Sequence, residues 1–328
     1  DLFFRRLKEY FIKAKNVAHG ITLVQYILIA LSVLALLTYV LWSSALFDSL
    51  YYHYQNIRWN EEYAVVPGLG NLEDRFAFNS NYLLLSAIFT FRLIFGEPVY
   101  QMQSVLYLFL ILWVQYEVIK SKFKTSRIIL LFSFLIFYFL TIEYVADTST
   151  DIIPNICIFY LIAKFSLYPQ YIQEKNLFVF IIPIILITFK VSIIPFSLIS
   201  IFIFLCLYKK KDYVSILFLL SIPFSVVGIW LVRNVIISGY LIYPFPYLDI
   251  FSFDWKIPKG IAILQQNYIL DYAKGLLIDC LRFGFFQRGG SIITFKLFFV
   301  NNVILVSSYF IIAISTIYVF YNNFINKK

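Results

Sequence analysis

Long apolar runs separated by short polar intervals make up most of the chain. A helix needs roughly 20 apolar residues to cross a hydrocarbon core of about 30 Å. The runs therefore predict an all-α fold, a polytopic transmembrane helical bundle with about eight spans. The predicted spans are residues 21–42, 99–118, 128–145, 152–165, 177–191, 194–208, 213–232 and 296–320.

Clusters of Lys and Arg orient these spans. They precede the first span in residues 1–15, follow the second span in residues 120–127 and precede the seventh span in residues 209–211. Basic loops of this kind lie on the cytoplasmic side of a membrane, so the first span is expected to run outward. Two long outer loops are then expected, at about residues 43–98 and 235–295.

An apolar segment at residues 81–95 is predicted not to cross the membrane. Between the outer stretch after the first span and the inner basic loop at residues 120–127, the chain must cross an odd number of times. Residues 81–95 are shorter than the span that follows them, contain Arg92 and end before a Gly-Glu-Pro sequence. We therefore expect interfacial helices in the first outer loop, lying on the outer membrane surface.

The composition supports a membrane protein and does not favour nucleic-acid binding. Hydrophobic residues make up 61% of the chain and charged residues only 14%, whereas charged residues are about a quarter of an ordinary soluble domain. The formal net charge of +9 comes from the basic loops expected in the cytoplasm. Cys157, Cys206 and Cys280 have no paired spacing, so neither a disulfide framework nor a zinc site is expected. Residues 1–328 are expected to form a single domain. Because the sequence begins at Asp1 and not at a methionine, the interpretation as a fragment of a longer chain with further spans stays open.

The longest polar interval of the first half, residues 47–81, directly follows the first span and is the predicted floor of an active site. Asp48 lies at its start, at the lipid–water boundary. A carboxylate beside apolar walls can act as a general base that takes a proton from an attacking hydroxyl. Asp48 is equally compatible with a helix N-cap, whose side chain accepts backbone N–H bonds. His53 and Gln55 follow as candidate substrate-binding residues, although a lone His in an aromatic run is more often structural.

Asp147 and Asp151 occupy a short acidic outer loop, VADTSTD, before the fourth span. They are candidates for a second acid or base, for binding substrate hydroxyls or for holding a metal ion. The alternative is a solvated loop in which Asp151 caps the following helix, which Pro154 helps to start. A divalent cation stays open as a cofactor, but no motif with ligand spacing occurs and no metal ligand is assigned.

Lys190 and Arg233 lie near the predicted outer ends of two spans. A charge at that position is costly unless it snorkels, pairs with another group or faces a cavity, so both are candidates for function. Snorkelling is the alternative, and it is stronger for Lys190 than for Arg233. A guanidinium can bind two oxygens of a phosphate at once. Arg233 is therefore the preferred candidate for binding a lipid phosphate.

The layout and two strings of the sequence resemble known families. The chain has an outward first span with an Asp at its outer mouth, a long first loop with the segment NYLLLSAIFTFRLIFGEP, and an acidic loop before the fourth span. This layout resembles the GT-C superfamily of membrane glycosyltransferases, in particular the protein O-mannosyltransferases and the lipid A aminoarabinose transferases. The strings FDSLYYHYQNIRWNEEYAVVPGLGNLEDRFAFNS and WLVRNVIISGYLIYPFPYLDIFSFDWKIP are more specifically similar to a bacterial family of envelope membrane proteins described mainly as hypothetical.

The superfamily resemblance implies an enzyme that transfers a sugar from a polyprenyl-phosphate donor. The acceptor would be a glycan, lipid or protein outside the cytoplasm, in envelope glycan or glycoconjugate synthesis. The resemblance also implies an integral protein of the bacterial inner membrane whose active site faces outward. On this resemblance the base maps onto Asp48, the second-loop acid onto Asp147 or Asp151, and the phosphate-binding cation onto Arg233 and then Lys190.

One departure and two alternatives accompany this resemblance. Ser49 follows Asp48, where the superfamily often has paired acids, and this weakens the inference of a metal-dependent site. A polymerase or ligase of surface polysaccharide, which would use a diphosphate-linked glycan, stays open. A transporter or flippase is less expected, because transporters place polar groups at the midplane of paired repeats and no repeat is apparent. The aromatic candidates for stacking on sugar rings are Tyr51, Tyr52, Trp59, Tyr243 and Trp255.

Overall fold

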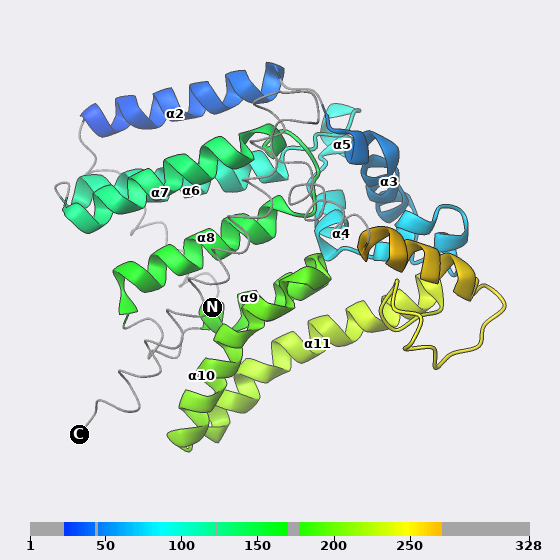
Figure 1. Cartoon of the computed structure of the whole chain (residues 1–328). Helices are drawn as coiled ribbons and strands as arrows, with labels where there is room; N and C mark the ends of the chain where they lie inside the picture. Colours follow the sequence, from blue (N-terminus) through cyan, green and yellow to red (C-terminus); the bar gives the residue numbers. More distant parts are fainter. Residues whose placement is uncertain (1–22, 43–44, 122–123, 170–176, 271–328) are drawn as a thin grey trace, which may run out of the picture.

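The computed structural model describes residues 23–42, 45–121, 124–169 and 177–270, and all regular secondary structure in these residues is helical (Figure 1). This confirms the all-α class for the described part of the chain. The α-helices are α2 (Leu23–Trp42), α3 (Tyr54–Glu62), α4 (Asn81–Ile88), α5 (Arg92–Phe95), α6 (Met102–Lys120), α7 (Thr125–Thr141), α8 (Ile152–Leu167), α9 (Leu177–Phe189), α10 (Leu198–Lys209) and α11 (Tyr213–Ser238). Shorter helical turns are η1 (Ser49–His53), η2 (Leu69–Asn71), η3 (Asp74–Phe78), η4 (Ile142–Tyr144) and η6 (Val191–Ser197), and a further helix covers residues 259–270.

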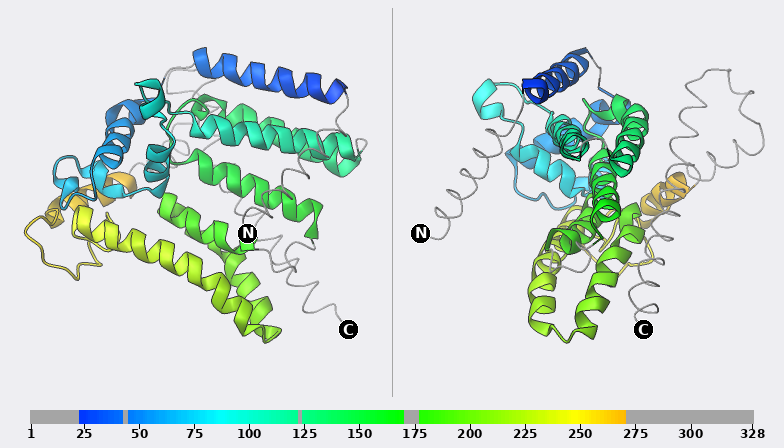
Figure 2. Two further views of the ribbon diagram at one scale, coloured as in Figure 1. Left: turned by 180° about the vertical axis from the view of Figure 1, so that it is seen from behind. Right: turned by 90° about the vertical axis from the view of Figure 1, so that its left-hand side faces the viewer.

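Helices α2 and α6 to α11 form a bundle in which neighbours along the chain pack against each other (Figures 1 and 2). Polar segments gather at one end of this bundle, and we call residues 45–101, 145–151 and 239–270 the cap. The basic junctions between α6 and α7 and between α10 and α11 lie at the opposite end (Figure 1). The segments predicted to be outer loops therefore meet, away from the basic loops, and the side of the membrane that each end faces stays a prediction.

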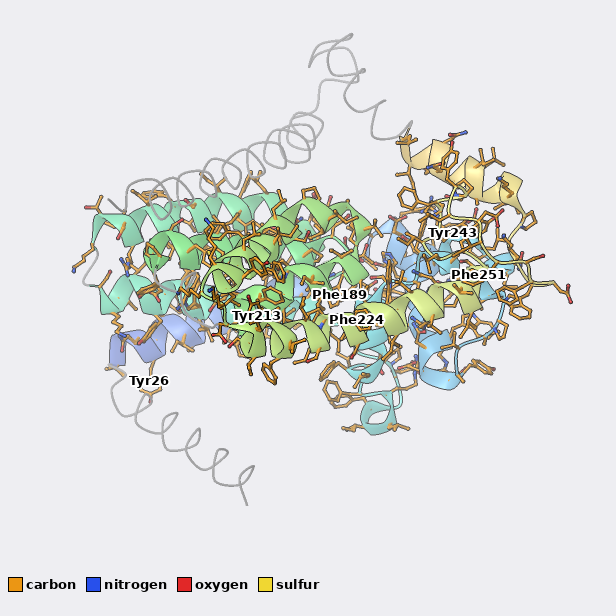
Figure 3. The ribbon with its side chains drawn as sticks, turned by 90° about the horizontal axis from the view of Figure 1, so that it is seen from below. Tyr26, Phe189, Tyr213, Phe224, Tyr243 and Phe251 are labelled. Carbon is orange, nitrogen blue, oxygen red and sulfur yellow. The ribbon has the colours of Figure 1, made fainter. Side chains whose placement is uncertain are left out.

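Four helical segments are long and apolar enough to cross a membrane: Met102–Lys120, Thr125–Tyr144, Val191–Lys209 and Tyr213–Ser238. Other predicted spans form shorter apolar helices at Gln25–Leu41, Ile152–Leu167 and Val179–Phe189. The predicted span at residues 296–320 lies outside the described residues. Large apolar side chains point outward from the long helices, such as Phe224 of α11, which is 82% exposed (Figure 3). These features are those of an integral membrane protein.

Two apolar cores hold the bundle together, and both include α8. One core joins α8, α9, α10 and α11, and the other joins α2, α6, α7 and α8. Because the helices are apolar all round, one face of each packs inward while another is left for lipid. Buried members of the first core include Leu161, Phe180, Phe196, Ile203 and Leu219, and those of the second include Leu36, Tyr107, Val114, Phe134 and Ile156.

The cap has a core of its own, made from both predicted outer loops. Its buried side chains come from the first loop (Tyr52, Leu69, Phe76 and Ala77) and from the end of α11 and the segment after it (Ile237, Tyr240, Tyr243, Ile257 and Ala262). The two loops approach so closely at Gly70 that a Cβ atom there would lie 2.5 Å from Cδ1 of Ile257. The loops therefore fold as one unit although they are far apart in sequence.

Residues 81–95, where we expected interfacial helices, form the two short helices α4 and α5. Ser80 caps α4 by accepting a hydrogen bond from the Tyr82 backbone N–H at 3.3 Å. The left-handed backbone of Phe91, with φ at 52°, separates the 8 residues of α4 from the 4 residues of α5. Tyr82 and Leu83 of α4 are buried in the cap, whereas the large apolar side chains from Ile88, the last residue of α4, to the end of α5 are exposed. At about 1.5 Å per residue, neither helix is long enough to cross a membrane.

Candidate functional site

Asp48 lies at the start of the cap, directly before the π-helical turn η1. Such turns are rare and are frequent at functional sites. The carboxylate does not cap this turn. Instead, its Oδ1 accepts a hydrogen bond from Nη1 of Arg75 at 3.2 Å. The N-cap interpretation of Asp48 is therefore wrong, and its side chain, 54% exposed, is open to a polar substrate.

Arg75 is the cation at this carboxylate, and the sequence analysis did not select it. Its guanidinium lies over the rings of Tyr51, Tyr52 and Tyr268, with distances to the ring centroids of 5.4, 5.3 and 5.8 Å. Contacts of this kind attract a cation to the face of an aromatic ring. Tyr268 belongs to the helix at residues 259–270, so both halves of the cap fix the position of Arg75. The only signal in the sequence was that Arg75 shares the polar interval of Asp48.

Ser49 anchors the chain next to Asp48 through a buried hydrogen-bond cluster. Its Oγ lies 2.7 Å from Oγ1 of Thr148 and 3.3 Å from Nδ1 of His53. It also accepts a hydrogen bond from the backbone N–H of Thr148 at 3.2 Å. Ser49 is completely buried, so this cluster positions the backbone that carries Asp48 and does not itself meet a substrate.

Asp147 strengthens the same connection between the first loop and the acidic loop. Its Oδ1 accepts a hydrogen bond from the backbone N–H of Leu46 at 3.3 Å, and the residue is only 1% exposed. Burial raises the pKa of the Asp147 carboxyl, although hydrogen bonds from neighbouring groups oppose the rise. Asp147 thus holds the segment before Asp48 in place.

His53 is enclosed in the same cluster and is 3% exposed. Burial, together with the nearby cations Lys190 and Arg75, lowers the pKa of its imidazole to about 3. The imidazole is therefore neutral near pH 7. Its Nε2 is buried and has no hydrogen-bond partner in the part of the chain that the structure describes.

Lys190 and Asp151 form an ion pair on the other side of this cluster. The pair joins the end of α9 to the start of α8, and its side chains are 38% and 49% exposed. The Asp151 side chain does not cap α8, so that interpretation of the sequence is wrong. Lys190 is close enough to lower the pKa of His53, which places the pair beside the cluster around Ser49.

Arg233 lies in α11 and binds amide side chains of the first loop. Its Nη1 donates to Oδ1 of Asn79 and its Nη2 donates to Oδ1 of Asn60. Asn79 also donates to Asn234 at 2.7 Å and accepts from Nε1 of Trp230 at 2.7 Å. Arg233 is 9% exposed, its Nε has no partner, and it makes no ion pair with a carboxylate among the described residues. It is a buried cation held by neutral groups.

The structure thus brings most of the candidate residues to one end of the bundle. Arg233 lies on the α11 side of the cap, linked to the Asp48 side through the segment from Arg75 to Asn79. Gln55 is exposed and donates to the backbone oxygen of Leu50 at 2.9 Å, so it does not join the cluster. The residues gathered around Ser49 are Asp48, His53, Asp147, Asp151 and Lys190.

Of the aromatic candidates, Tyr51 and Tyr52 lie beside Arg75, whereas Trp59 and Trp255 contact other rings of the cap. The ring of Trp59 lies against that of Tyr63 at an interplanar angle of 39°, and Trp255 stacks on Phe253 with ring centroids 4.7 Å apart. Within the described ranges, no group of three or more His, Cys, Asp or Glu side chains could hold a metal ion.

Comparison with known proteins gives one match. No curated protein and no solved structure matches the chain. The model of a family described as "Domain of unknown function (DUF8201)" matches residues 2–328. Because this match covers nearly the whole sequence, the chain belongs to the DUF8201 family.

Proposed function

We propose that this protein is a glycosyltransferase of the bacterial inner membrane. It would move a sugar from a polyprenyl-phosphate donor to an extracytoplasmic acceptor, in envelope glycan or glycoconjugate synthesis. The observation that supports this most is the exposed carboxylate of Asp48, held by Arg75 at the polar end of an apolar bundle. A lipid-borne donor and a hydrophilic acceptor can meet at such a boundary.

In the proposed reaction, Asp48 takes the proton of the acceptor hydroxyl. The hydroxyl oxygen forms a bond to the anomeric carbon while the bond from that carbon to the phosphate oxygen breaks. The electron pair leaves with the lipid phosphate, and the configuration of the sugar is inverted. Arg75 fixes the Asp48 carboxylate through Oδ1, and Oδ2 makes no hydrogen bond within the described part of the chain and is free for the proton.

A cation must offset the charge that develops on the leaving phosphate, and such electrostatic stabilisation is commonly a large part of catalysis. Arg233 is the candidate from the sequence, but it would have to release Asn60 or Asn79 first. Lys190 is more exposed and would have to release only Asp151. Lys190, which lies on the Asp48 side of the cap, is therefore the better placed of the two candidates.

The test is a transfer assay on membranes that contain the full chain. Polyprenyl-phosphate donors with a radiolabelled hexose or pentose are supplied, and label in the acceptor fraction is counted. We expect Asp48→Asn to lower transfer by about 10²-fold or more, the usual contribution of a general base. The matched control is Asp254→Asn, a change at an exposed Asp of the second outer segment, which should leave transfer unchanged.

Two outcomes would count against this proposal. A folded Asp48→Asn protein that keeps full transfer would exclude Asp48 as the base. Transfer that requires a diphosphate-linked oligosaccharide, and not a monosaccharide phosphate, would favour a surface-polysaccharide polymerase or ligase instead.

A further inference from the structure

A group of large apolar side chains projects from the cap around α5. Leu93 is fully exposed, Ile94 is 72% exposed and Phe95 is 65% exposed. Figures 2 and 3 show α5 standing away from the side of the molecule, next to the polar end of the bundle. A protein surface in water rarely exposes so many adjacent apolar side chains. We call this group, Ile88, Phe89, Phe91, Leu93, Ile94 and Phe95, the apolar tip.

The apolar tip is a closed loop and not a loose segment. The backbone N–H of Val99 donates to the oxygen of Thr90 at 2.8 Å and joins the two ends of the loop. Glu61 of α3 accepts hydrogen bonds from the Thr90 hydroxyl and, at 3.1 Å, from Nε of Arg92. Arg92 is the only charged residue among residues 88–95, and this pair neutralises it. Residues 88–95 therefore present apolar side chains without an unpaired charge, and the exposed Glu97 lies two residues before Val99 at the base of the loop.

The position of the loop along the bundle indicates what covers it. Val99, at the base of the loop, precedes Met102, the first residue of α6, by only a few positions. α6 is one of the four helices that are long and apolar enough to cross a membrane. The loop therefore lies at the level where α6 would enter the hydrocarbon region, and its apolar side chains are exposed there.

We propose that the apolar tip inserts between the lipids of the leaflet on the cap side and so holds the cap against the membrane surface. The partner is the acyl-chain region of the bilayer just below the headgroups, where apolar side chains of surface helices are buried by about 5–10 Å. The inserted element is the α5 loop with Ile88 at the end of α4, because the buried residues of α4, Tyr82, Leu83 and Ser86, hold the rest of that helix in the cap. This inference does not depend on the proposed transferase activity.

The test measures the surroundings of a nitroxide at the tip. Leu93→Cys is made in the full chain, with Cys157, Cys206 and Cys280 replaced by Ala, and the labelled protein is placed in vesicles of phosphatidylcholine and phosphatidylglycerol. Collision rates with oxygen, which enters lipid, and with a polar nickel complex, which stays in water, are compared. The matched control is Tyr247→Cys, at a side chain that is 85% exposed on the segment after α11, which extends beyond the end of the bundle (Figure 1).

We expect the ratio of oxygen to nickel collisions to be several-fold higher at position 93 than at position 247. Equal ratios at the two positions would overturn the proposal, because the tip would then lie in water. Low collision rates with both reagents at position 93 would also overturn it, in favour of a protein partner. If spin–spin broadening accompanied those low rates and disappeared on dilution with unlabelled protein, the partner would be a second copy of this chain.

Discussion

Nη1 of Arg75 donates to Oδ1 of Asp48 at 3.2 Å, and the same guanidinium lies over the ring of Tyr268. The helix at residues 259–270 therefore contacts the candidate base through one intermediate residue. Changes in that helix can alter the position of the Asp48 carboxylate without touching it.

Replacing Arg75 should lower the rate of sugar transfer strongly and the free energy of unfolding only slightly. Arg75→Gln removes a partly exposed ion pair and the contacts with the tyrosine rings, which together stabilise the fold by about 1 kcal/mol. Transfer should fall strongly because the Asp48 carboxylate loses its fixed orientation. Arg75→Lys should be intermediate, since an ammonium group keeps the charge but cannot stack as a planar group. Thermal unfolding in detergent and the transfer assay measure the two effects, and full transfer by Arg75→Gln would show that orientation by Arg75 is unimportant.

His53 should make the protein less stable in mild acid. The pKa of His53 is about 3 in the folded protein, whereas an unfolded histidine has a pKa of about 6.5. Between these values the unfolded chain binds a proton and the folded chain does not, so stability falls as the pH is lowered through this window. His53→Gln should flatten that dependence, as measured by unfolding temperature from about pH 7.5 to about pH 4.5. If the unfolding temperature of His53→Gln fell with pH as steeply as that of the unchanged protein, another titrating group would be responsible. The variant keeps His19, which is the only other histidine in the sequence.

Arg233→Gln should destabilise the cap. The change removes the guanidinium that donates to the buried Asn79 and the partly buried Asn60 and leaves their amide oxygens without this donor, at a cost of about 3 kcal/mol. The control is Arg58→Gln, because Arg58 forms an exposed ion pair with Glu62 and its loss should change stability by only about 0.5 kcal/mol. Unfolding in detergent measures both. If Arg233→Gln abolished transfer with no loss of stability, Arg233 would act on the donor phosphate and not as a structural group.

Labelling from the two sides of the membrane should place the cap outside the cytoplasm. Single cysteines at the exposed positions Leu50 and Asp254 of the cap should react with an impermeant maleimide added outside intact cells. A cysteine at Lys210, between α10 and α11, should react only after the inner side is opened, because basic loops face the cytoplasm. Ser49 is unsuitable as a labelling position because it is completely buried. Reaction of Leu50 and Lys210 from the same side would contradict the arrangement of the bundle.

Helix positions could be predicted from apolar runs, but some of their ends could not. α11 begins at Tyr213 as expected, where Asp212 caps it by accepting from the backbone N–H of Ser215 at 3.3 Å. Its predicted end before Arg233 is wrong, because the helix continues to Ser238. Polar residues at that point suggested a loop, whereas the structure buries them against the first loop, and Gly239, with φ at 80°, ends the helix.

The candidate site was predicted only as a set of ionisable residues. The polar interval after the first span indicated Asp48 and His53 as candidates, and the acidic loop indicated Asp147. The groups that position them, such as Arg75 and Thr148, depend on contacts between distant segments, and no local spacing encodes those contacts. A polar side chain in a sequence does not reveal which other polar side chain it will face.

The hydrogen bonds of Asn79 determine when the cap can be completed during biosynthesis. Asn79 belongs to the first loop, which is synthesised early. Its partners Trp230, Arg233 and Asn234 are synthesised about 150 residues later. Until α11 has been inserted, the first loop has polar groups without partners and lacks half of its apolar core. The nascent chain therefore passes through a stage in which this loop is open to chaperones and proteases, and insertion of α11 ends that stage.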